Sequence, residues 1–196
     1  MTPEEARRKR AYGYVFQAPA LYPWRTVIRN LTLPLEIMGL DRREREARAV
    51  KYLDMVGLNG FERKFPWQLS GGMQQRVSIA RALSFEPHLL LMDEPFGALD
   101  EITRDHLNEQ LIGLWEQTGK TVIYITHSIE EALLMGDRTV IMTAQPGRIK
   151  RIIDVPFPHP RDLIQLSASP EFGALKLDIW RVLEEEVNRA RAEVEG

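Results

Sequence analysis

The chain alternates between short apolar runs and amphipathic stretches, a pattern that predicts a mixed α/β fold. The apolar runs are typical of strands, and they cover residues 12–16, 88–92, 121–126, 139–143 and 148–155. The amphipathic stretches have apolar residues at helical spacing, and they predict helices over residues 26–39, 41–57, 70–84, 103–118, 128–134 and 170–194. From residue 85 onward strands and helices alternate, which favours a parallel sheet.

Four of the predicted helices carry an apolar stripe that should face a core. The stripes are Val27, Leu31 and Leu35 in the first helix, Ala47, Val50, Leu53 and Val56 in the second, Met73, Val77, Ala80 and Leu83 in the third, and Phe172, Leu175, Ile179, Leu183 and Val187 in the last. Pro34 is expected to kink or interrupt the first helix, because proline lacks the backbone N–H that a helix needs. Residues 154–162 have prolines at three alternate positions and are expected to be irregular.

Composition narrows the class of protein. With 196 residues, of which 44% are hydrophobic, the chain suits one domain with a possible subdomain. A net charge of −2 gives no basic field of the kind that nucleic-acid binding requires. The absence of cysteine excludes disulfides and cysteine-based chemistry. With no apolar run near the roughly 18 residues of a membrane span, and a polar N-terminus, the sequence predicts a soluble intracellular protein.

Two carboxylates follow one of the apolar runs. Leu89–Met92 has the pattern of a central parallel strand buried on both faces, and Asp93 and Glu94 come directly after it. Ligands of open α/β sheets lie beyond the carboxyl ends of the strands. In that position Asp93 would hold Mg²⁺ and Glu94 would polarise an attacking water. The alternative is that the acids simply end the strand and cap a turn before Pro95.

A serine and two glycines begin the third predicted helix. Ser70, Gly71 and Gly72 would expose backbone N–H groups at a helix N-terminus, with no bulky side chain in the way. Together with the helix dipole this makes an anion site. The alternative is an ordinary serine N-cap. A cap alone would not require two glycines, which weaken a helix start, and this favours the anion site.

Four further polar residues accompany these motifs. His127 follows the strand at 121–126 and is expected at the same sheet edge as the two carboxylates. Gln17, also at a strand end, has an amide that could contact both a metal and a water. Asp100 could be a plain helix cap. The pair Gln74 and Gln75 would ordinarily belong to a solvated helix face.

One apparent phosphate-loop motif is excluded. Gly119-Lys120-Thr121 matches the end of the pattern G-x-x-x-x-G-K-[ST], but Leu114 stands where the first glycine belongs. In addition, a helix leads into a strand here, whereas a phosphate loop joins a strand to a helix. Gly119 is instead predicted to be a helix C-cap.

Taken together, these motifs resemble the ATP-binding subunit of ABC transporters. The matching segments, in family order, are Tyr14–Gln17 (Q-loop), Leu69–Gln74 (signature), Leu89–Glu94 (Walker B), Ala98–Asp100 (D-loop) and Ile125–His127 (switch histidine). Within the family, Gln17–Trp24, Pro95–Asp100 and Asp154–Arg161 are similar to importers of nitrate, sulfonates, taurine and related small solutes.

The resemblance implies an arrangement of subunits and ligands. Two subunits would sandwich two ATP molecules with Mg²⁺ in a two-fold pair. In each site one subunit would supply the catalytic residues Glu94, His127 and Gln17 and the metal ligands Asp93 and Gln17. The nucleotide-contacting residues of the signature and D-loop would be Ser70, Gly71, Gly72, Gln74 and Asp100. The signature would reach across to the ATP of the partner subunit.

The resemblance also implies a domain organisation and partners. The fold would be an incomplete P-loop NTPase core with a parallel sheet, plus an α-helical signature subdomain. The segments would be residues 1–25 (core remnant with the Q-loop), 26–84 (helical subdomain), 85–153 (core) and 154–196 (C-terminal turn and helix). Besides a second ATPase subunit, the partners would be an integral membrane permease and, indirectly, a solute-binding protein, with no nucleic acid. The location would be the cytoplasmic face of the membrane.

The sequence departs from the family before the Q-loop. Only eleven residues precede Tyr12, where the family places a Walker A loop, an adenine-stacking aromatic and several strands. The chain is therefore expected neither to bind ATP well alone nor to bury its sheet fully. A start codon placed too late is the favoured explanation. The alternatives are a short subunit that lends only its signature to a partner, and a decayed, catalytically inert fragment.

Overall fold

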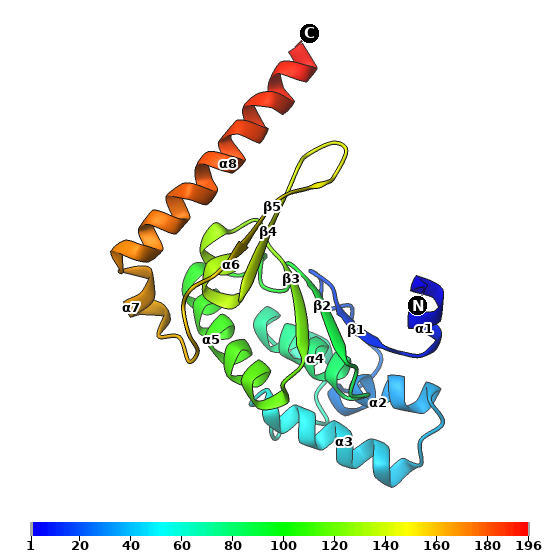
Figure 1. The fold of residues 1–196 in the computed structure, drawn as a ribbon. Coiled ribbons are helices and arrows are strands. Elements are labelled where there is room, and N and C mark those ends of the chain that lie inside the picture. The colour runs from blue at the N-terminus through cyan, green and yellow to red at the C-terminus, as the bar shows by residue number, and fades with distance from the viewer. Residues whose placement is uncertain (1, 196) are drawn as a thin grey trace. The chain divides into compact units, whose positions relative to one another are not determined.

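The computed structural model describes residues 2–195, with side chains up to residue 189. The chain forms two compact units, residues 1–125 and 126–196 (Figure 1). The first unit contains a three-stranded parallel sheet of β1 (Tyr12–Val15), β2 (Leu89–Asp93) and β3 (Thr121–Ile125). The strand order is β1-β2-β3, so β2 is central. The predicted parallel sheet is confirmed for these three strands.

The two faces of this sheet differ in burial. Leu90 and Met92 of β2 are 3% and 0% exposed, whereas the alternate residues of β2 are only half-buried. On β3, Ile123 and Ile125 are 50% and 49% exposed. The prediction that β2 is buried on both faces is therefore wrong, because the first unit covers one face of the sheet and leaves the alternate residues of β2 half-buried. The expectation that the sheet would not be fully buried is confirmed.

Residues 2–125 of the first unit also contain five helices and a 3₁₀ turn. They are α1 (Pro3–Arg8), α2 (Val27–Ile37), α3 (Arg42–Met55), the 3₁₀ turn η1 (Pro66–Gln68), α4 (Gly71–Leu83) and α5 (Glu101–Thr118). Of these, α4 packs directly on the sheet at β1. The short helix α1 was not predicted; Thr2 and Glu5 form a capping box at its start. Helix α2 runs through Pro34 without interruption. Buried Leu31 and Leu35 on either side of the proline offset the missing hydrogen bond.

The predicted stripes are only partly correct. On α3 the buried side chains are Ala49, Tyr52 and Leu53, while Ala47 is exposed and Val50 is 48% exposed. The spacing of apolar residues does not show which of two adjacent stripes on α3 faces the core. Burial of the Tyr52 ring determines which face is turned inward. On α4, Met73 is only half-buried, but nearly every residue from Val77 onward is buried. This follows because α4 contacts α2, α3 and β1 together.

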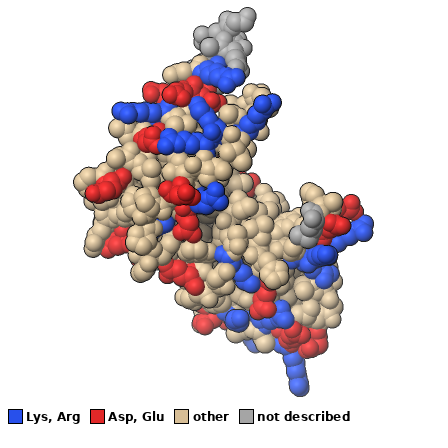
Figure 2. All heavy atoms as spheres, viewed as in Figure 1, with Lys and Arg blue, Asp and Glu red and all other residues tan. Residues whose placement is uncertain are grey.

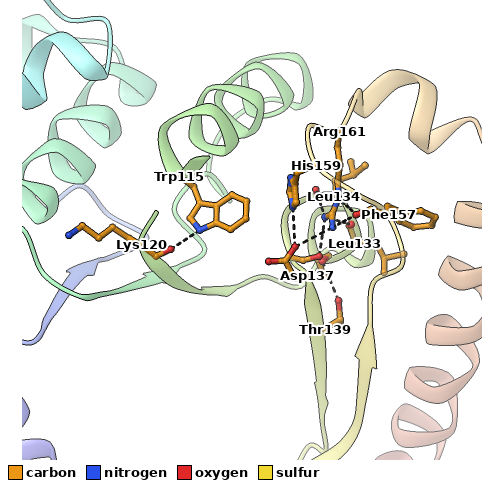
Figure 3. Close-up of polar contacts among 11 residues, drawn as sticks. Trp115, Lys120, Leu133, Leu134, Asp137, Thr139, Phe157, His159 and Arg161 are labelled. Atoms are coloured by element: carbon orange, nitrogen blue, oxygen red, sulfur yellow. Dashed lines mark hydrogen bonds and ion pairs between the residues drawn. The ribbon is translucent and has the colours of Figure 1, made fainter. Parts of the chain in front are cut away.

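The carboxyl end of α5 confirms that the Gly119 motif is not a phosphate loop. Gly119 has φ 58° and ψ 26° and is the C-cap of the helix. The left-handed conformation is one that glycine adopts without strain. The indole Nε1 of Trp115 donates to the Lys120 carbonyl at 2.6 Å and closes the turn into β3 (Figure 3).

The second unit contains α6 (Ile129–Met135), β4 (Arg138–Met142), β5 (Ile149–Asp154), α7 (Leu163–Ser167) and α8 (Pro170–Glu195). β4 and β5 form an antiparallel pair. The expectation that the strand at 139–143 continues the parallel sheet is therefore wrong. The connection between β4 and β5 is a short hairpin, and parallel pairing would need a much longer crossover. A core of apolar side chains covers one side of the pair: Leu133, Ile141, Ile153, Val155, Phe172 and Ile179.

The stripe on α8 is correct where the helix meets this core. Phe172 and Ile179 are 1% and 2% exposed, and Leu175 and Leu183 pack against the same cluster. Val187 is 49% exposed, so its predicted burial is wrong.

Arg161 organises the irregular, proline-rich segment after β5, which is irregular as predicted. Its side chain is 1% exposed. Its three nitrogens donate five hydrogen bonds of 2.7–3.2 Å to backbone carbonyls of Phe157, Leu133, Leu134 and Gly136. Asp137 lies 3.5 Å from Nη2, and burial, opposed by that carboxylate, lowers the pKa of Arg161 (Figure 3). One guanidinium thus ties α6 to the segment that leads into α7.

Candidate functional site

The edge of the sheet beyond β2 brings three of the predicted residues together. Asp93 is the last residue of β2, and Glu94 follows it. The Nε2 of Gln17, two residues beyond β1, donates to Glu94 Oε2 at 3.2 Å. The hydroxyl of Tyr14 donates to Asp93 Oδ2 at 3.4 Å. Parallel pairing causes this meeting, because it places the carboxyl ends of β1 and β2 at one edge.

The backbone holds Glu94 in a constrained position. Its φ is 42°, in the left-handed region that residues other than glycine rarely adopt. Its N–H donates to the carbonyl of Ile125 at 2.9 Å, which ties the turn after β2 to the end of β3. A Cβ on Gly97 would lie 3.3 Å from Glu94 Oε2, so the glycine leaves room for the carboxylate. Strain of this kind is concentrated at functional sites.

Tyr14 was not singled out from the sequence. It lies on the uncovered face of β1 and is 37% exposed. Partial burial, together with the charge and the hydrogen bond of Asp93, raises the pKa of its hydroxyl. Alternation along residues 12–15 places Tyr14 on the face opposite Val15, but only the strand register shows that it reaches Asp93.

The Ser-Gly-Gly helix start has the N-cap form. The Oγ of Ser70 accepts from the N–H of Met73 at 3.3 Å, and Ser70 and Gly71 are exposed. Gly72 is buried, and a Cβ there would lie 3.2 Å from Leu107 Cδ1 on α5. Close packing against α5 is therefore a second physical reason for this glycine. The free N–H groups and the helix dipole still make the exposed end attractive to an anion.

The two glutamines after the glycines have different roles. Gln74 is half-buried and its Nε2 donates to the carbonyl of Leu69 at 3.2 Å, within its own helix start. Gln75 is 2% exposed and its Nε2 donates to the Phe16 carbonyl at 2.8 Å. A solvated face is therefore wrong for Gln75. This side chain ties the signature helix to the residue just before Gln17, a contact that only tertiary structure reveals.

Two other side chains fix the loop that follows Gln17. Arg81 donates to the carbonyls of Ala20 and Pro19 at 2.9 and 3.1 Å, and burial lowers its pKa. Asn30 is fully buried, accepts from the Tyr22 N–H and donates to carbonyls between residues 22 and 26. The loop is thereby held against α2 and α4, with its aromatic side chains toward solvent.

The remaining predicted residues are Asp100 and His127. Asp100 is the exposed N-cap of α5 and accepts from the Thr103 N–H at 3.0 Å, and hydrogen bonding at this helix start lowers its pKa. The prediction that Asp100 could be a helix cap is therefore confirmed. His127 lies two residues beyond β3, in the second unit, beside Ser128, the N-cap of α6. Its relation to the carboxylates stays a prediction.

The donor set at the sheet edge suits Mg²⁺. Carboxylate and amide oxygens are the ligands that this ion prefers, and it keeps places for water and phosphate oxygens. The Nε2 of Gln17 is hydrogen-bonded to Glu94. The Oε1 of Gln17 is therefore the amide atom that can coordinate a cation. Among the described residues no group of three or more acidic, histidine or cysteine side chains could hold a metal unaided. Phosphate oxygens would have to complete the coordination.

The surface gives two further observations. Basic and acidic side chains are intermixed over the face that Figure 2 shows. Of the helices in residues 2–195, none combines the length and the apolar character that crossing a membrane requires.

The parallel sheet, its acidic edge and the glycine-containing helix start are typical of α/β proteins that bind nucleotides. A family model described as "ABC transporter" matches residues 1–97. The chain is 49% identical to an uncharacterized ABC transporter ATP-binding protein of Methanocaldococcus jannaschii, over 89% of this chain and 64% of that protein. It is 48% identical to the taurine import ATP-binding protein TauB of Rhizobium johnstonii, over 87% of this chain and 67% of that protein.

A third relative, TauB of Roseobacter denitrificans, is 42% identical over 89% of this chain and 68% of its own length. Among solved structures, a dimeric ATP-binding cassette bound to ADP and phosphate has a TM-score of 0.65 at 36% identity, covering 81% of this chain and 69% of that chain. The protein therefore belongs to the ABC transporter family of ATP-binding proteins. It spans about two thirds of the length of the curated relatives named here.

Proposed function

We propose that this protein is the ATP-hydrolysing subunit of an ABC importer. The observation that carries the proposal is the contact between Gln17 and Glu94 beside Asp93 at one sheet edge. A metal-binding carboxylate, a water-polarising carboxylate and an amide bonded to the second of them are groups that phosphoryl transfer to water uses.

Each residue at the edge has a distinct role in this proposal. Asp93 and the Oε1 of Gln17 would hold Mg²⁺, which supplies charge neutralisation at the phosphates when bound. Glu94 would orient and polarise the attacking water, and the amide of Gln17 keeps its carboxylate in place. His127 would contact the terminal phosphate. Positioning and charge stabilisation would provide most of the rate enhancement.

A second copy of the subunit would complete each site. The exposed helix start at Ser70 and Gly71 is oriented by the packing of Gly72 against α5 and stays open at its N-terminus. In a two-fold pair this end would face the ATP of the partner, together with Gln74 and the exposed Asp100, whose neighbour Leu99 would lie 3.6 Å from a Cβ on Gly71. The similarity to a dimeric ATP-binding cassette supports this arrangement.

The relatives support a class of solute. Two of the most similar proteins are taurine import ATP-binding proteins. We therefore propose small sulfonates such as taurine, or related nitrate-type solutes, as the cargo. The subunit would act at the cytoplasmic face of the membrane with an integral permease and, indirectly, a solute-binding protein. Residues 26–84 would form the helical subdomain that docks on the permease, between core segments 1–25 and 85–153, with 154–196 as the C-terminal segment.

Steady-state phosphate release at saturating Mg-ATP tests the proposal, because the chain alone is expected to bind ATP weakly and a low ATP concentration would hide the chemical step. Glu94→Gln keeps the size of the side chain and removes the charge, so the rate should fall at least about a hundredfold. The matched control is Glu109→Gln on the exposed face of α5, which should leave the rate unchanged. Equal rates for Glu94→Gln and the unmodified protein would mean that the protein is not an ATPase by this mechanism.

A further inference from the structure

A cavity of about 350 Å³ lies in the first unit, between the end of α3, α4 and α5. This volume falls within the range of about 300–1,000 Å³ that small-molecule sites occupy. Its wall is mainly apolar and includes Ile79, Phe96, Leu107, Leu111 and Leu114. None of the residues assigned above to ATP or Mg²⁺ lines it. The cavity is therefore a separate feature that the proposed ATPase does not use.

Arg76 is the cationic side chain in this cavity. Its Nη1 donates to the Val56 carbonyl at 3.1 Å, while its Nε is buried and has no hydrogen-bond partner within the described part of the chain. Burial lowers its pKa. Asp54 also lines the cavity, but it accepts from Asn59 and forms no ion pair with Arg76. Arg76 is half-buried, and a partly desolvated guanidinium without a counter-charge is less favourable than a paired one, so an anion at this position would stabilise it.

Gly113 keeps one wall of the cavity open. It lies in the interior of the 18-residue helix α5, where glycine is less stable than alanine. A Cβ built on Gly113 would meet no atom within 4 Å, so close packing does not explain the glycine. Because Gly113 lines the cavity, a larger side chain there would extend into it.

We propose that this cavity binds a small amphipathic anion, with its carboxylate, sulfonate or phosphate group on Arg76 and its apolar body against the aliphatic wall. The guanidinium suits a planar or tetrahedral oxyanion because it presents several N–H donors in a fixed fork. The wall supplies the apolar contact that orients the rest of the molecule. Arg76 and Ser70 lie at either end of the first turns of α4, so a bound anion would contact the helix that carries the signature.

Amide NMR titration with hexanesulfonate tests the proposal, with 1-hexanol as the neutral probe. Hexanesulfonate should give saturable shifts at the amides of Gly57 and Gly113, and 1-hexanol should bind at least about tenfold more weakly. Arg76→Gln should lower the hexanesulfonate affinity by a similar factor. Gly113→Leu should abolish binding by filling the cavity. Its matched control is Gly173→Leu on α8, another helical glycine with open space around it, which should bind normally.

Three outcomes would overturn the proposal. The first is the absence of saturable shifts at Gly57 and Gly113. The second is equal affinity for the sulfonate and the alcohol, and the third is shifts confined to the uncovered sheet face at Ile123 and Ile125. If the amide spectrum shows that Arg76→Gln does not fold, the comparison of Gly113→Leu with Gly173→Leu still tests whether hexanesulfonate binds in the cavity.

Discussion

Replacement of Arg161 by methionine should selectively unfold the second unit. The side chain is 1% exposed and donates five hydrogen bonds to four backbone carbonyls. Methionine has a similar length but no donor, so these carbonyls would lose their partners. A carbonyl inside the fold that loses its donor costs about 1–3 kcal/mol, so the loss of these five bonds should destabilise the unit by roughly 3–5 kcal/mol. A unit of this size has a total stability of roughly 4–10 kcal/mol, so most of it would be lost.

Amide hydrogen exchange of the two units in the same sample measures this effect. In Arg161→Met the amides of β4 and β5 should exchange through a much more frequent opening, while those of β1 to β3 should change little. The control is Arg151→Met, because Arg151 pairs with Asp178 at 2.8 Å with both side chains nearly half exposed. Exposed pairs contribute at most about 1 kcal/mol. Equal exchange in the two variants would refute the role assigned to Arg161.

Two further predictions concern the first unit. Gln75→Ala should destabilise the first unit by about 1–3 kcal/mol in urea unfolding, because the Phe16 carbonyl loses its donor and the buried Gln75 side chain loses its packing. An effect no larger than that of Gln74→Ala would contradict this. Burial and Glu86 raise the pKa of Tyr52 to about 12, above about 10 in the unfolded chain. The folded state therefore holds this proton more tightly, and its stability should be full below pH 10 and fall as the pH rises toward 12. The stability of Tyr52→Phe should fall less steeply between pH 10 and 12. Parallel curves of stability against pH for the two proteins would exclude Tyr52 as the cause.

The sequence is sufficient where structure is locally encoded. The N-cap at Asp100 and the left-handed C-cap at Gly119 form as expected, because each depends on residues within one helical turn. The meeting of Gln17 with Glu94 also follows, because parallel strands share an edge.

Contacts between distant residues could not be predicted in this way. The bond from Gln75 to Phe16 spans 59 positions, and Arg161 reaches a carbonyl 28 positions away. Nothing in the local pattern distinguishes these side chains from solvated ones. The same holds for β4, since an apolar strand pattern does not specify whether its partner is parallel or antiparallel, and here the short hairpin decides.

The central claim is that the signature of one subunit serves the ATP held by the other. Mixing two inactive variants tests it most directly. Glu94→Gln retains a working signature, whereas Gly71→Asp places a negative charge at the exposed helix start; its Cβ would make only an ordinary contact, 3.6 Å from Leu99. Each variant alone should be inactive. An equal mixture should recover about a quarter of the normal phosphate release, because half of the pairs would contain one intact site. A mixture as inactive as either variant alone would contradict the account.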